Sequence, residues 1–369
     1  MDIGIPREIQ IEEKRISLAP QGVYSLIREG HRVYIEKDAG LDGHFSDEDF
    51  QKVGGEIVYS HEEAFKRADL VVKVMPPTEE ECDLLQESQM IFSFLQLGLR
   101  SHQSMAKLIE NKVTAVGTEL IETESGYKPV LEAMSEIGGC MIPQIAGRFL
   151  ECTHGGRGIT ISGIPGIPPA SIVILGVGKV GLHAANALIG LGAQVYVLDK
   201  DLQKLRYMDV HFHKRVITAM SNRYNIERAL QFADVVIGSV FEYGKKAPIL
   251  VTKDLLSSMK KGALIIDVAI DQGGCFETSR PTTHSDPIFE KEGIIHYCVP
   301  NIPAAVARSA SRALNHVILP YVLRIGEEGF KKAVEADIEL GKGIFTHNGK
   351  CTNKEIAELF NLPYKKLNV

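Results

Sequence analysis

The chain has 369 residues, which is more than one ordinary hydrophobic core requires and predicts two domains. With 44% hydrophobic and 24% charged residues, its composition is typical of a globular protein that folds in water. A formal net charge of −6, without a basic stripe, argues against a nucleic-acid partner.

The sequence also argues against a membrane, an export route and a metal site. No apolar run approaches the roughly 18 residues of a membrane span, and the N-terminus lacks the basic and apolar segments of a signal peptide. The 6 cysteines include no CxxC pair, which predicts reduced thiols and no bound metal. His211 and His213 would share one face of a strand, but no third ligand accompanies them and we expect both to be exposed. These features together predict a cytoplasmic protein.

The first third of the chain alternates short strand patterns with helical ones. Residues 3–5 and 32–36 predict strands, and the amphipathic segment 20–29 between them predicts a helix that ends before Gly30. His61 lies in a polar segment, which predicts a surface position. Further strands are expected at 70–74, 90–94 and 113–117. Strands that alternate with helices predict a mostly parallel sheet covered by helices.

The middle of the chain opens with a segment rich in glycine and proline, residues 153–169, which predicts a loop. A strand at 172–175, a helix at 180–191 and a strand at 194–198 follow it and form a βαβ pattern. Later strands are expected at 235–238, 263–268 and 294–299. From Ser309 to the end the pattern is predominantly helical.

The turn of the βαβ pattern carries the sequence G-x-G-x-x-G, with Gly176, Gly178 and Gly181. The first glycine permits a tight turn after the strand, and the second lets the backbone approach a pyrophosphate. The third lets the helix pack closely on the sheet, while the N–H groups at the start of the helix face the phosphates. This spacing predicts a dinucleotide-binding site.

The second strand of this unit ends in Asp199, where a carboxylate can accept hydrogen bonds from the ribose of adenosine. The same carboxylate would repel a 2′-phosphate, so the pattern favours NAD over NADP. The alternative is a glycine-rich turn without a ligand, followed by an aspartate that only caps the next element.

Segments along nearly the whole chain resemble the alanine dehydrogenases, within the wider group that includes the proton-translocating transhydrogenases. The segment 271–277, DQGGCFE, resembles the alanine dehydrogenase branch most specifically. The other matching segments lie on both sides of the glycine fingerprint, at 4–8, 14–20, 134–136, 155–158, 163–166, 221–222, 246–248 and 299–301.

The resemblance implies an α/β fold of two Rossmann-like doubly wound domains. The NAD-binding domain, 131–305, would be inserted into a discontinuous substrate domain made of 1–130 and 306–369. The resemblance also implies a homo-oligomer, a hexamer or a dimer, that oxidises L-alanine to pyruvate and ammonia and passes the hydride to NAD. Further cofactor contacts are implied at Ser135, Lys179, Val180, Lys204, Ser221, Ser239 and Val240.

Arg15 stands where the family has its carboxylate-binding arginine, and its planar fork suits a bidentate carboxylate contact. The alternative is an arginine that pairs with a nearby glutamate such as Glu8. The resemblance also places Asn301 at the substrate. These two residues match the family pattern.

The family's second cation, a lysine, is replaced by Met75, which carries neither charge nor hydrogen-bond donor. Lys73 shares a strand face with Met75 by alternation and could supply the missing charge only if it points to the substrate. The family also has a lysine at that position and does not use it in this way.

The family's acid–base histidine is replaced by Gln96, which has no usable pKa near neutrality. Losing a positioned histidine should lower the rate of the family reaction about 10²–10⁴-fold. Asp271 remains at the family position close to nicotinamide and substrate. It can stabilise an iminium, orient an amine or relay a proton through water. Alternatively, it only braces its own loop.

Three hypotheses follow from these departures. The first is an NAD-dependent oxidoreductase for an amino acid, amine, imine or keto acid other than alanine or pyruvate. The second is a catalytically silent homologue that still binds NAD and acts as a sensor or scaffold. The third is an alanine dehydrogenase with a rearranged site.

Overall fold

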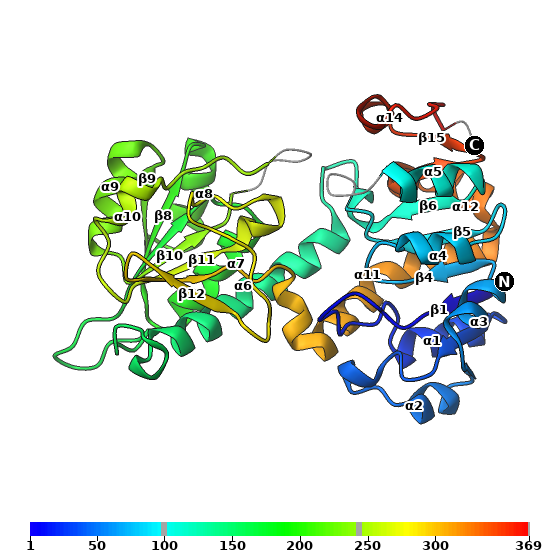
Figure 1. Ribbon diagram of the computed structural model, residues 1–369, viewed down its shortest axis with the longest axis horizontal. Coiled ribbons are helices and arrows are strands. Elements are labelled where there is room, and N and C mark those ends of the chain that lie inside the picture. The colour runs from blue at the N-terminus through cyan, green and yellow to red at the C-terminus, as the bar shows by residue number, and fades with distance from the viewer. Residues whose placement is uncertain (97–101, 241–245, 368–369) are drawn as a thin grey trace. The chain divides into compact units, whose positions relative to one another are not determined.

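The computed structural model describes residues 1–96, 102–240 and 246–367, and the chain divides into two compact units. The first unit consists of Met1–Met134 and Ala304–Val369, and the second of Ser135–Pro303. The chain passes from one to the other within helix α6 (Pro129–Leu150) (Figure 1). None of the helices in these ranges combines the length and apolar character needed to span a bilayer.

The first unit contains an eight-stranded sheet with the order β15-β14-β6-β5-β4-β1-β2-β3. Strands β1 to β6 run parallel, whereas β14 and β15 pair antiparallel at one edge. The strand order reverses between β1 and β4, and residues that follow these two strands meet outside their carboxyl ends. The strands are β1 (Asp2–Ile5), β2 (Arg32–Glu36), β3 (Glu56–Val58), β4 (Leu70–Val72), β5 (Met90–Ser93), β6 (Thr114–Gly117), β14 (Ile344–His347) and β15 (Lys350–Cys351).

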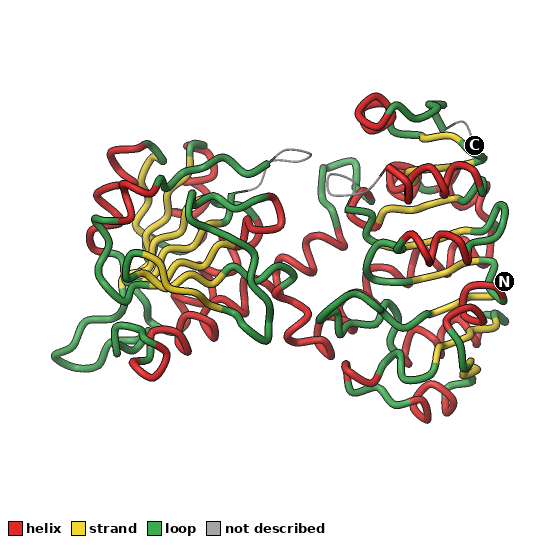
Figure 2. The backbone as a smooth tube through the Cα atoms, viewed as in Figure 1, coloured by secondary structure: helices red, strands yellow, loops and turns green. Residues whose placement is uncertain are grey.

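Helices surround this sheet (Figure 2). Helix α1 begins with Pro20 at its first turn, where a missing N–H is tolerated, and Gly30 follows its end with φ +83°. The helices of the unit are α1 (Pro20–Arg28), α2 (Asp47–Lys52), α3 (His61–Lys66), α4 (Glu79–Leu84), α5 (His102–Glu110), α11 (Ala307–Glu328), α12 (Phe330–Ala336), α13 (Ile338–Gly343) and α14 (Lys354–Phe360).

The second unit contains a seven-stranded sheet with the order β12-β13-β11-β10-β7-β8-β9. All its strands are parallel except β12, and the order reverses between β7 and β10. The strands are β7 (Ser171–Leu175), β8 (Gln194–Asp199), β9 (Val216–Met220), β10 (Val235–Gly238), β11 (Leu264–Asp267), β12 (Ile288–Lys291) and β13 (Ile294–Tyr297). The α-helices that lie wholly within it are α7 (Lys179–Gly190), α8 (Leu202–His211), α9 (Arg223–Phe232) and α10 (Lys253–Leu256).

Strand β7 shows why the second sheet is buried on both faces. Ile172 and Ile174 pack in a core with α7 and α8, whereas Val173 and Leu175 pack in another with α9 and α10. A strand that is apolar at every position fits this arrangement, because successive side chains point to opposite faces. The predicted α/β architecture with mostly parallel, doubly wound sheets is confirmed.

The C-terminal part is predominantly helical, as expected, but it also contains a short strand that the sequence analysis did not predict: residues Ile344–His347 form β14 and pair antiparallel with β6. A strand of four residues carries too little pattern to be separated from the helices around it. His211 lies at the end of helix α8 rather than on a strand, and His213 follows with φ +50°. Both rings are exposed, as expected.

Candidate active site

The glycine fingerprint lies directly between β7 and α7. Gly176 has φ +97°, and a Cβ there would lie 2.8 Å from Cγ1 of Val240. A Cβ at Gly181 would lie 2.4 Å from the carbonyl oxygen of Gly176. Helix α7 begins after Gly178, and no side chain in the described chain caps this end. Its first N–H groups and the open backbone of Gly178 therefore fit a pyrophosphate.

Asp199 ends β8 beside this loop and is 7% exposed. Its Oδ2 accepts a hydrogen bond of 2.7 Å from the N–H of Val177, and Oδ1 accepts one of 2.8 Å from the N–H of Asp201. The carboxylate is thus fixed at the glycine loop, where the sequence predicts contact with an adenosine ribose.

Ser239 directly follows β10 and lies beside the glycine fingerprint. Its hydroxyl donates to the carbonyl oxygen of Gly176 over 2.6 Å, and its N–H donates to the carbonyl of Leu175 over 2.9 Å. The N–H of Ser221 donates to the carbonyl of Asp199 over 2.9 Å. The structure thus brings Ser239 to the fingerprint at the point where the strand order reverses, whereas Ser221 lies beside Asp199 at the end of β9. The other predicted cofactor residues also lie in the second unit: Ser135 on α6, Lys179 and Val180 on α7, Lys204 on α8 and Val240 after Ser239.

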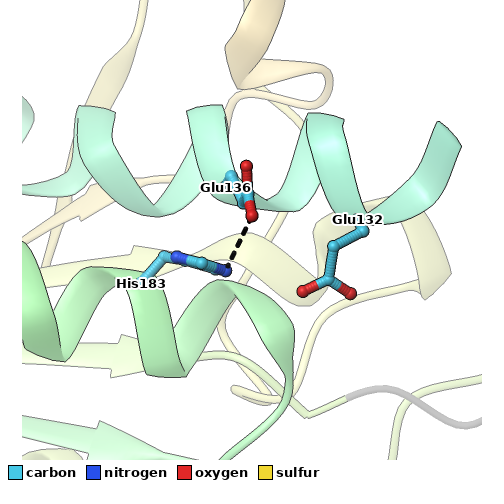
Figure 3. A group of neighbouring side chains, drawn as sticks. All are labelled: Glu132, Glu136 and His183. Atoms are coloured by element: carbon cyan, nitrogen blue, oxygen red, sulfur yellow. Dashed lines mark ion pairs between the residues drawn. The ribbon is translucent and has the colours of Figure 1, made fainter. Parts of the chain in front are cut away.

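An ion pair that the sequence analysis missed joins α7 to α6 (Figure 3). Nε2 of His183 lies 3.8 Å from Oε1 of Glu136. The two helices touch closely at Gly139, where a Cβ would lie 2.5 Å from Cβ of His183. The pair thus lies at the contact between α6 and α7, the helix that follows the glycine fingerprint.

Arg15 is buried in the first unit and bound by a glutamate. Its Nε donates to Oε1 of Glu13 over 2.7 Å, and NH2 donates to Oε2 over 2.6 Å. The alternative that Arg15 pairs with a nearby glutamate is confirmed, although its partner is Glu13 and not Glu8. The two residues stand two positions apart, so an extended segment brings both side chains to one side.

The N–H groups of Arg15 that do not bind Glu13 face two thioether sulfurs. NH1 lies 3.3 Å from the sulfur of Met134, and NH2 lies 3.7 Å from the sulfur of Met75. A thioether sulfur is a weak acceptor, and both methionine side chains are flexible. The structure thus brings Arg15 and Met75 together, with donors that a carboxylate would bind more strongly than sulfur does.

Lys73 does not replace the missing family lysine. It is 1% exposed, and its Nζ lies 2.5 Å from Oε1 of Glu81 and 3.7 Å from Oε2 of Glu8. The Lys73 charge is therefore held by two buried carboxylates. The carboxylate Oε1 of Glu8 also accepts hydrogen bonds from the N–H groups of Val74, over 2.5 Å, and Met75, over 3.3 Å.

His61 extends this network, although its polar surroundings in the sequence predicted a surface position. Nδ1 lies 2.7 Å from Oε2 of Glu36, and Nε2 lies 3.0 Å from Oε1 of Glu81. Burial opposes a charge on the ring, but the hydrogen bonds to the two glutamates raise the pKa of His61 to about 9. Burial likewise opposes the charge of Glu81, but His61 and Lys73 lower the pKa of its carboxyl.

Gln96 follows β5 with φ +47°, and its side chain is exposed. Glu119 holds the backbone here: Oε1 accepts from the N–H of Leu95 over 2.9 Å and from the N–H of Gln96 over 2.8 Å. Burial raises the pKa of the Glu119 carboxyl. Glu119 is therefore a positioning residue for Gln96 that motif reading alone did not show.

Asp271 and Asn301 belong to the second unit. Asp271 lies in the short 3₁₀ helix Val268–Gln272 that follows β11, and its side chain is exposed. Asn301 has φ +55°, and its carbonyl oxygen lies 3.3 Å from Nε2 of His284. Both residues thus follow carboxyl ends of parallel strands, β11 and β13.

Comparison with known proteins establishes the family of this chain. The family models "Alanine dehydrogenase/PNT, N-terminal domain" and "Alanine dehydrogenase/PNT, C-terminal domain" match residues 4–138 and 143–354. The chain belongs to the alanine dehydrogenase/PNT family. An alanine dehydrogenase of Methanococcus maripaludis is 42% identical over 99% of this chain and 98% of its own length. One of Staphylococcus haemolyticus is 42% identical over 99% of this chain and 97% of its own length.

Solved structures of the alanine dehydrogenase/PNT family have the same architecture. A structure titled L-alanine dehydrogenase has a TM-score of 0.93 and 40% identity, covering 98% of this chain and 99% of that one. A transhydrogenase from Sinorhizobium meliloti, 21% identical with a TM-score of 0.81 over 96% of this chain and all of its own, shares the fold. Family membership and the intact fingerprint make the chain an NAD-dependent oxidoreductase.

Replacing Glu119→Ala should loosen the segment that carries Gln96. Backbone N–H groups of Leu95 and Gln96 would lose their acceptor, which lowers the free energy of unfolding by about 1–3 kcal/mol. Urea unfolding measures this loss, and hydrogen exchange should speed up at these two amides. The exposed carboxylate of Glu124 offers a matched control, since Glu124→Ala should change neither quantity. Unchanged exchange at residues 95 and 96 would contradict the positioning role.

Proposed function

We propose that this enzyme oxidises or forms the C–N bond of an amino acid, amine or imine, or reduces the related keto acid, and that its substrate differs from alanine and pyruvate. The observation that carries this proposal is the environment of Arg15. Its spare donors face the sulfur atoms of Met75 and Met134, where the resemblance to alanine dehydrogenases implies a lysine beside the arginine. A site with one guanidinium and no ammonium binds a small anion less strongly than a site that has both.

The roles of the residues follow from their chemistry. Bound NAD supplies the hydride acceptor, and NADH supplies the donor in the reverse direction. Arg15 can take a substrate carboxylate after small movements of the two methionines, and Asn301 can hydrogen-bond the substrate. Gln96 can hold a carbonyl or amine without exchanging a proton. The exposed carboxylate of Asp271 can stabilise an iminium or relay a proton through water. An imine that arrives protonated needs less acid catalysis than a ketone, so this set of groups suffices for it.

A substrate panel tests the proposal. The purified chain would be mixed with NAD and amino acids or amines, or with NADH, ammonium and keto acids, and followed at the nicotinamide absorbance. We expect turnover of a compound other than alanine, with a higher kcat/KM than alanine has. Efficient turnover of alanine would contradict the proposal. Measurable NADH binding without turnover of any compound would instead support the catalytically silent homologue.

We further propose a homo-oligomer, a hexamer or a dimer, that works in the cytoplasm. The full-length similarity to alanine dehydrogenases supports this assembly, since the resemblance implies oligomers throughout the family. Light scattering of the purified chain at several concentrations gives the number of subunits. A stable monomer would contradict this part of the proposal.

A further inference from the structure

The first unit gathers an uneven set of charges where β1 and β4 end, buried except for the partly exposed His61 and Glu36. Its carboxylates outnumber its cations by one, and the set comprises Glu8, Glu13, Glu36 and Glu81 against Arg15, Lys73 and His61. A lysine in place of Met75 would balance the set. The substitution that removes the family cation therefore leaves one carboxylate without a matching charge.

Glu8 is the carboxylate of this set that is paired least well with a cation. Its side chain is 3% exposed, and Oε2 makes no hydrogen bond within the described chain. Glu13 already forms a bidentate pair with Arg15, whereas Glu81 receives both Lys73 and His61. The charge nearest to Glu8 is the ammonium of Lys73, whose Nζ lies 3.7 Å from Oε2, and backbone N–H groups donate to Oε1.

The groups around Glu8 make its charge unfavourable. Burial raises the pKa of its carboxyl to about 7; the charge of Lys73 and the N–H of Val74 oppose this shift, while Glu13 and Glu81 add to it. Met75 links this carboxyl to the substrate side, because its N–H lies 3.3 Å from Oε1 of Glu8 and its sulfur 3.7 Å from NH2 of Arg15. A substrate carboxylate on Arg15 would thus bring another negative charge close to Glu8.

We propose that Glu8 is a specificity-determining residue whose buried carboxyl takes up a proton when a substrate carboxylate binds Arg15. Binding of a carboxylate substrate is thereby coupled to the uptake of a proton. The inference rests on the proposed function in one respect, the placement of a substrate carboxylate on Arg15. Turnover is not needed to test it.

Calorimetry with oxamate, an unreactive analogue of a small keto acid, tests this coupling. The full chain saturated with NADH would be titrated between pH 6 and 9 in buffers of different ionisation enthalpy. Below pH 7 Glu8 already holds its proton, so the affinity should be constant there. Above pH 7 the affinity should fall by up to about tenfold per pH unit, with uptake approaching one proton per site.

Variants separate Glu8 from other titrating groups. In Glu8→Gln, proton uptake should vanish, and the affinity should change less than about twofold across this range, whereas Glu124→Gln should behave like the parent chain. Met75→Lys provides a second test that leaves Glu8 in place. Its ammonium should lower the pKa of Glu8 and shift the fall in affinity to lower pH.

Several outcomes would overturn the inference: no oxamate binding at any pH, binding without proton uptake, or uptake that persists in Glu8→Gln. If Glu8→Gln does not fold, an unchanged pH profile in Met75→Lys overturns it equally. Failure of the proposed function would look different. The parent chain would then bind oxamate with proton uptake, yet turn over no amine, amino acid or keto acid.

Discussion

Restoring both family residues, Met75→Lys with Gln96→His, is expected to raise turnover of L-alanine by about 10²–10⁴-fold. The lysine would add a cation beside the guanidinium of Arg15, whose NH2 already lies 3.7 Å from the side chain at position 75. The histidine would supply a group that exchanges protons near neutral pH, which glutamine cannot do. The initial rate of NAD reduction with L-alanine measures the gain.

Single variants and a matched double variant sharpen this experiment. Met75→Leu with Gln96→Asn changes the same two positions without adding a charge or an ionisable group, and it should show no gain. The lysine alone should act mainly on KM, and the histidine mainly on kcat. If the restored pair leaves alanine turnover unchanged, the substrate site has diverged beyond positions 75 and 96.

Removing the buried ammonium in Lys73→Met should lower the free energy of unfolding by about 3–5 kcal/mol. The substitution leaves Glu81 and Glu8 buried without the charge that now lies 2.5 Å and 3.7 Å from them. Urea unfolding followed by circular dichroism, at one protein concentration, measures the loss. Lys112→Met is the control. The side chains of Lys112 and its partner Glu87 are 54% and 68% exposed, so this substitution should leave the free energy of unfolding nearly unchanged.

The loss in Lys73→Met should also depend on pH. The pKa of Glu8 is about 7 in the fold against its ordinary value of 4.5, so the folded chain binds more protons than the unfolded chain in this window. The stability that this carboxyl contributes therefore falls as the pH rises from 4.5 to 7. Without the ammonium the pKa of Glu8 rises further, and the loss should be larger at pH 8 than at pH 6. An equal loss at both values would show that Glu8 does not titrate between pH 6 and 8, which would contradict this prediction.

The cofactor half of the enzyme could be predicted from the sequence because its determinants are local. Gly176, Gly178 and Gly181 follow one another on a strand–turn–helix unit, and Asp199 ends the next strand, so spacing alone placed them. The strands β1, β2, β4–β8, β10, β11 and β13 were also predicted from their sequence patterns. Strands β3, β9, β12, β14 and β15 were not predicted. They lie at or next to an edge of their sheet, and pairing with distant segments, such as that of β14 with β6, determines them more than composition does.

The proposed substrate site depends on contacts between residues far apart in the sequence, which the spacing of motif residues does not predict. Family resemblance identified Arg15, Met75 and Gln96, but not the partners that determine their behaviour. Glu119 holds the backbone of Gln96 from the end of a different strand, and His61 bridges two glutamates from separate elements. Long-range pairing of polar groups follows from the topology of the sheet, and it is visible only once the fold is known.

The two sheets of this chain have the same core strand order, each with its own reversal point. The groups predicted to hold the dinucleotide and those around Arg15 therefore stand at the ends of different sets of strands. Evolution, or a designer, can rework the substrate preference by mutating only the segments after β1, β4 and β5. A mutant library confined to these three segments should yield enzymes with new substrates that keep the parent's affinity for NADH.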